Sequence, residues 1–121
     1  MENIIEYLND RLSVPVYWGL LPDDVDFQTG AVSAVSSFLQ KDVVTDMNAE
    51  EYTFTVRSND VYTSNMIMME LNSVLRNSLG AIVEPYGQLQ WYFINQTGEV
   101  FEQEYNIYSI SSVWGLRYIY I

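Results

Sequence analysis

The middle of the chain holds the pattern that most restricts the fold, because a strand pattern runs directly into a long helix pattern. Residues 52–56 alternate between apolar and polar side chains, which predicts a half-buried strand. A helix over about 58–78 follows, with Ser58 or Asn59 as its cap and Gly80 as its end. A long helix joined so closely to a strand predicts that the helix packs on a sheet formed by that strand and others.

The segments before this unit predict a short helix and two further strands. Residues 2–12 carry apolar residues on one side only, as an amphipathic helix does. Residues 14–18 indicate a short strand, and Pro15 places it at a sheet edge or at a strand start. After a loop over 19–30, residues 31–39 alternate weakly and indicate a strand, and the acidic residues 40–51 indicate a loop or a hairpin tip.

The segment after Gly80 is rich in strand patterns. Residues 88–93 alternate, and the turn signal at 95–98 predicts a hairpin whose returning strand contains Phe101, Tyr105 and Ile107. A break near 111–112 separates that strand from a last one over 114–121. The order is α-β-β-β-α-β-β-β, so the predicted class is α+β, a mainly antiparallel sheet with both helices on one face. We expect residues 1–121 to form a single domain.

The charge and the residue types exclude several classes of function. The chain of 121 residues has a net charge of −11 and contains neither Cys nor His. Such a surface repels phosphate backbones and anionic membranes, so we expect no nucleic-acid and no membrane partner. Thiol nucleophiles, His bases and ordinary zinc sites are absent, and we expect no enzyme, no metal and no cofactor. The N-terminus is acidic and lacks the pattern of a signal peptide, which predicts synthesis in a cytoplasm.

Two clusters of acidic residues could have a chemical function. Asp23, Asp24 and Asp26 suggest calcium, but the spacing of an EF-hand loop would need Gly and Glu where the chain has other residues, so a solvated acidic loop is preferred. Glu102 and Glu104 would lie on one face of a predicted strand, about 7 Å apart. Glycoside hydrolysis uses pairs of carboxylates at a similar separation, but a solvent-exposed face of the sheet is the simpler interpretation.

Tyrosine and methionine are abundant in regions where a partner surface is an alternative to the core. The chain has ten Tyr, and we take four near its end as candidate subunit-interface aromatics: Tyr105, Tyr108, Tyr118 and Tyr120. Met66, Met68 and Met69 either fill gaps in the core or form an adaptable partner surface.

Four segments together resemble the tail terminator (tail completion, or minor capsid) proteins of long-tailed bacteriophages. They are the helix followed by VPVY and a PDD loop (14–24), the strand YTFTVRS (52–58), the segment NDVYTSN leading into a helix that ends LNSVLR (71–76), and the closing GLRYIYI. In layout the resemblance spans nearly the whole chain.

The resemblance implies a structural protein of the virion, located in the tail or neck, without catalytic residues. Members of this family form a ring, usually a hexamer, that caps the tail tube, stops its growth and provides the surface for head-tail joining. The implied partners are copies of the chain, the tail tube protein and the head connector protein. A negative subunit suits a conduit for DNA, and the candidate lumen or partner-facing acids are Asp42, Asp46, Glu50 and Glu51, with the three aspartates at 23–26 as a second set.

Other functions stay open at this point. Another tail or neck component, such as a tube subunit or a connector, would use a related fold. A small acidic binding or inhibitor protein that mimics DNA would also carry a large negative charge. A hydrolase that uses Glu102 and Glu104 is the third class.

Overall fold

The computed structural model describes residues 2–41 and 47–119, which form two helices and a mainly antiparallel sheet. This confirms the predicted α+β class and the order of helices and strands. The elements are α1 (Glu2–Asn9), β1 (Val16–Trp18), β2 (Ala31–Lys41), β3 (Asn48–Ser58), α2 (Val61–Arg76), β4 (Ile82–Val83), β5 (Gly87–Gln88), β6 (Gln90–Gln96), β7 (Val100–Glu102) and β8 (Ile107–Tyr118).

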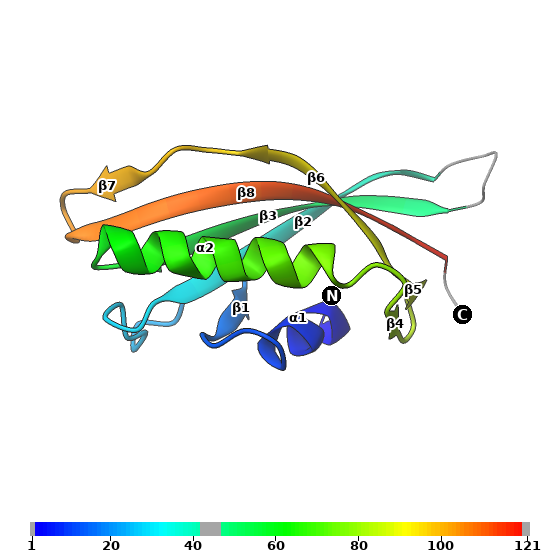
Figure 1. Cartoon of the computed structure of the whole chain (residues 1–121), viewed down its shortest axis with the longest axis horizontal. Coiled ribbons are helices and arrows are strands. Elements are labelled where there is room, and N and C mark those ends of the chain that lie inside the picture. Colours follow the sequence, from blue (N-terminus) through cyan, green and yellow to red (C-terminus); the bar gives the residue numbers. More distant parts are fainter. Residues whose placement is uncertain (1, 42–46, 120–121) are drawn as a thin grey trace.

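The main sheet has the strand order β1-β2-β3-β8-β6, and β7 pairs with β8 further along the same edge as β6. The pair of β1 with β2 is parallel, and the other pairs are antiparallel. Strand β1 lies at the edge and begins directly after Pro15, which agrees with both alternatives predicted from Pro15, an edge or a strand start. In Figure 1, α2 runs along the length of the sheet, α1 lies near β1, and β2 and β3 extend beyond the end of α2.

One face of the sheet packs against both helices and forms the core. Tyr52, Phe54 and Val56 of β3 point to this face and are fully buried. Trp114 of β8, paired with Tyr52 in the register, and Trp91 of β6 lie on the same side. The other face of β3 carries residues that are only half-buried, so the period of two along this strand separates a helix-covered face from a helix-free face.

Hydrogen bonds fix the helices to their neighbours. Asp60 is the N-cap of α2 and accepts hydrogen bonds from the backbone N–H and the hydroxyl of Thr63. The cap therefore lies one or two residues after the predicted Ser58 or Asn59. Asn9, at the end of α1, donates from its amide to the carbonyl of Val16 and accepts from the N–H of Val16, at 2.9 and 2.8 Å.

Gly115 of β8 allows an aromatic ring to lie on the helix-free face. Tyr92 is its register partner on β6, and an ideal Cβ at position 115 would lie 2.0 Å from Cζ of Tyr92. The guanidinium of Arg117 lies 5.0 Å from the centroid of the same ring. Only a residue without a side chain fits beneath Tyr92 in this arrangement.

Three predicted boundaries are wrong. The signal at 95–98 does not close a hairpin, because β6 and β7 both pair with β8 and the hairpin turn lies at 103–106, where Asn106 has a positive φ of 54°. Strand β8 is continuous through 111–112, because Ser111 and Ser112 pair in register with Thr55 and Phe54 of β3, and the hydroxyls of Ser111 and Thr55 also bond to each other. Around the stretch 40–51 the strands pair as a hairpin, which is one of the two predicted alternatives, but they reach further into it, since β2 extends to Lys41 and β3 begins at Asn48.

Among the described residues, no helix has both the length and the apolar character needed to cross a membrane.

Candidate interaction surfaces

Of the four acids that the sequence suggests for a lumen, the structure describes Glu50 and Glu51, which are neighbours in β3 and point to opposite faces of the sheet. Asp42 and Asp46 lie outside the described residues. Glu50 points to the helix-covered face and is 4% exposed, and its Oε2 has no hydrogen-bond partner in the described structure. Glu51 points to the opposite face and is half-buried opposite Gly115. In the single chain, Glu51 is therefore the more accessible of the two described acids.

The four candidate interface tyrosines also have different surroundings. Tyr105 lies in the turn before β8 and is 66% exposed. Tyr108 is half-buried and packs against Phe101 at a ring-centroid distance of 4.7 Å. Tyr118 is buried against Tyr86, so the single chain leaves it little surface for a partner. Tyr120 lies outside the described residues.

The two glutamates considered for hydrolysis do not form a pair on a strand. Strand β7 ends at Glu102, and Glu104 lies in the turn that follows. Glu102 forms an ion pair with Arg57 on the helix-free face, with 3.5 Å between Nε and Oε1. Arg57 also donates to the hydroxyl of Ser33. These contacts link β7 to β3 and β2, which is a structural role.

The acidic loop after β1 is organised by its own hydrogen bonds. Asp26 accepts from the Thr29 hydroxyl at 2.9 Å and from the Gln28 N–H at 3.0 Å. The Thr29 hydroxyl and then the Gln28 N–H hold the pKa of Asp26 below its ordinary value of 3.8. Within the described residues, no group of three or more acidic, His or Cys side chains is arranged to hold a metal ion.

A groove on the helix-free face is the first surface that the sequence patterns missed. Its volume is about 640 Å³, and its walls include Leu20 from the loop after β1, Val35 from β2 and Tyr105 from the turn before β8. Thr53 and Thr55 of β3 also line it, together with the Arg57–Glu102 pair. The sequence signal for this groove is the apolar content of an acidic loop, which carries Leu20, Leu21 and Phe27.

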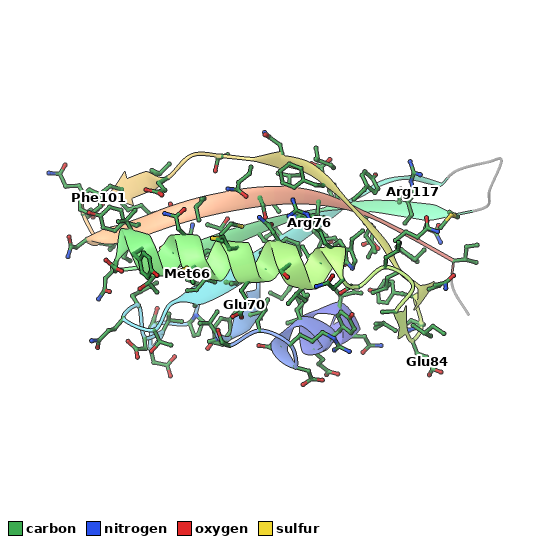
Figure 2. All side chains as sticks on the ribbon, viewed as in Figure 1. Met66, Glu70, Arg76, Glu84, Phe101 and Arg117 are labelled. Carbon is green, nitrogen blue, oxygen red and sulfur yellow. The ribbon has the colours of Figure 1, made fainter. Side chains whose placement is uncertain are left out.

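The outer side of α2 is the second surface. The structure divides the three methionines between the core and this exposed side. Met68 is buried in the core, but Met66 and Met69 are exposed. They form a row with three other exposed side chains of the helix, which we call the α2 ridge: Tyr62, Met66, Met69, Ser73 and Arg76. Figure 2 labels Met66 on α2, and Glu70 on the side of the helix turned toward α1.

Comparison with known proteins identifies a related fold. No protein-family profile and no curated protein sequence matches the chain. Among solved structures, it is similar to a chain in the virion of a native gene transfer agent particle, with a TM-score of 0.58 and 16% sequence identity. The similarity covers 85% of this chain and 77% of the other chain. At this level of identity, the similarity shows a shared fold.

Proposed function

We propose that this chain is a structural protein of a phage-like virion, with no catalytic activity, and that it acts as a tail terminator. The observation that carries the proposal is the shared fold with a chain of the gene transfer agent virion, over most of both chains. The sequence resemblance to tail terminators supports the finer assignment. In this role the copies form a ring, a hexamer by resemblance, that caps the tail tube and joins it to the head connector in the neck of the particle.

The described surfaces are compatible with this role. A ring needs two different, complementary surfaces on each subunit, because its contacts are head-to-tail. The groove and the α2 ridge are two such surfaces, and they differ in shape and in residue type. For the DNA conduit, we propose Asp42, Asp46 and Glu51 as lumen-facing acids that repel passing DNA.

Tail assembly without the chain tests this function directly. Tails assembled in its absence should grow to irregular lengths and should lack heads in negative-stain electron micrographs. Purified protein should restore uniform lengths and attached heads, and Gly98→Ala, at a position with nothing within 4 Å, should restore them equally well. Tails of normal length with heads attached in the absence of the chain would refute the proposal.

Electron microscopy of the purified protein alone distinguishes a tail terminator from the nearest alternative, a tube subunit. A tube subunit, by contrast, would polymerise on its own into long open tubes. Purified protein that forms such tubes would replace the terminator assignment and keep the assignment to the virion.

A further inference from the structure

The α2 ridge has an unusual composition for the outer side of a helix in this protein. Exposed helix faces normally carry charged side chains. The 16 residues of α2 include only two charged ones, Glu70 and Arg76, although the chain as a whole has 16 acidic residues. Tyr62, Met66 and Met69 are 69%, 47% and 65% exposed. Loss of charge with enrichment in Tyr, Met and Arg is the composition of the centre of a protein interface.

The polar side chains beside the ridge are occupied by contacts within the chain. On one side of the helix, Glu70 accepts hydrogen bonds from the N–H and the hydroxyl of Ser13, at 2.6 and 3.0 Å. On the other side, Asn72 donates to Gln96 and accepts from the indole of Trp114. These bonds hold the flanking polar groups in place, so the ridge between them is left with Tyr62, two methionines, Ser73 and Arg76.

The groove lies on the opposite side of the molecule, because its floor is the helix-free face of the sheet. Its charged side chains are Arg57 and Glu102, which pair with each other, and Asp23 at the rim loop, so the groove carries little net charge. Much of the remaining lining of the groove consists of hydroxyl groups, such as that of Thr55, and of apolar side chains, such as Leu20 and Val35.

We infer that copies of this chain associate head-to-tail, with the α2 ridge of one copy seated in the groove of the next copy. The inference rests on the proposed function, and it specifies the surfaces that build the ring. The charge favours another copy as the occupant. Two copies that each carry −11 repel each other, so they can approach closely only through surfaces with little net charge. The ridge and the groove are surfaces of this kind, and a head-to-tail contact between two different surfaces forms a ring where the rotation between successive copies closes.

A pair of complementary variants tests this inference. Met69→Glu places a charge on the ridge and leaves the groove intact, and Val35→Glu does the reverse. Each variant alone should lose self-association by about 100-fold or more, because a buried unpaired charge is costly at the centre of an interface. Leu79→Glu, at an exposed apolar residue outside both surfaces, should associate as the wild type does.

Mixing the two variants gives the decisive measurement. The intact ridge of Val35→Glu can bind the intact groove of Met69→Glu, so light scattering of the mixture should show a species of twice the chain mass, although neither variant forms it alone. The wild-type chain should associate more strongly as salt is added, since salt screens the repulsion between acidic copies. Association of either variant at wild-type strength, or a mixture that stays monomeric, would overturn the inference.

The outcome is distinct from that for the proposed function. A wild-type chain that stays monomeric at all salt concentrations overturns the ridge–groove contact. Irregular, headless tails in the absence of the chain would still support the terminator function. Normal tails in its absence would refute the function, even if ridge and groove bind as inferred.

Discussion

Substitution of Gly115 by Ala tests the arrangement of the helix-free face. The new Cβ would lie 2.0 Å from Cζ and 2.4 Å from Cε2 and Oη of Tyr92. These atoms are at the far end of the Tyr92 side chain, so the ring can avoid the contact by rotating away from β8, and it then also leaves Arg117. The ring must therefore leave the surface of β8, or the two strands must move apart.

The expected loss of stability follows from these two options. Overpacking of this kind costs about 1–3 kcal/mol, and the lost contact between Arg117 and the ring adds about 0.5–1 kcal/mol. We expect Gly115→Ala to lower the free energy of unfolding by about 2 kcal/mol. For a chain of this length the entropy of unfolding is about 0.25 kcal/mol/K, so Tm should fall by about 8 °C.

Urea unfolding followed by tryptophan fluorescence measures this loss. Gly98→Ala is the matched control, because no atom lies within 4 Å of a Cβ there, and it should change the stability by less than about 0.5 kcal/mol. Tyr92→Ala should make Gly115→Ala nearly neutral, since the clashing ring is gone. A cost of Gly115→Ala that is unchanged in the Tyr92→Ala background would refute the reasoning, as would a cost no larger than that of the control.

Three further predictions concern single carboxylates. Asp60→Ala removes the cap of α2 and should cost about 1 kcal/mol in urea unfolding, whereas an unchanged midpoint would contradict the cap. Glu50→Met replaces a buried carboxylate whose Oε2 has no partner and should raise the free energy of unfolding by about 1 kcal/mol, and a less stable variant would contradict this. Asp26 has a lowered pKa in the folded chain, so its charged form stabilises the fold above pH 3.8, and this contribution is lost as the pH falls through the lowered pKa. Wild type should therefore exceed Asp26→Asn in stability at pH 7 and lose the difference in strong acid, with Asp24→Asn as the control for net charge; a difference that persists in strong acid would contradict the assignment.

The sequence was sufficient for the elements with strong periodicity. The alternation at 52–56 predicted β3, and the apolar row of the following helix predicted α2. Each element has one side that stays buried along its length, so its sequence repeats with the period of that structure. Pro15 predicted the position of β1 at an edge or a strand start for a local reason, the missing N–H. In these places, local preference and tertiary packing select the same structure.

The sequence failed where tertiary pairing decides the structure. The turn signal at 95–98 is genuine in composition, but β8 is long enough to pair with β6 and β7 in succession, so the chain continues along it and turns only at 103–106. The groove was missed for a similar reason. The groove joins residues from the loop after β1, two central strands and the last turn, and only their register brings Leu20, Val35 and Tyr105 together.

The bonds between Asn9 and Val16 have a consequence for how copies of this chain can meet. Both backbone groups of Val16 are occupied by the amide of a side chain, which stands where another strand would bind, and Pro15 beside it has no N–H to offer. A new strand therefore finds few hydrogen-bonding groups at this border, and the sheet resists extension into a fibre there. In the proposed ring, which would hold a fixed number of copies, suppression of open-ended strand-by-strand growth would be as necessary as the contacts that hold the copies together.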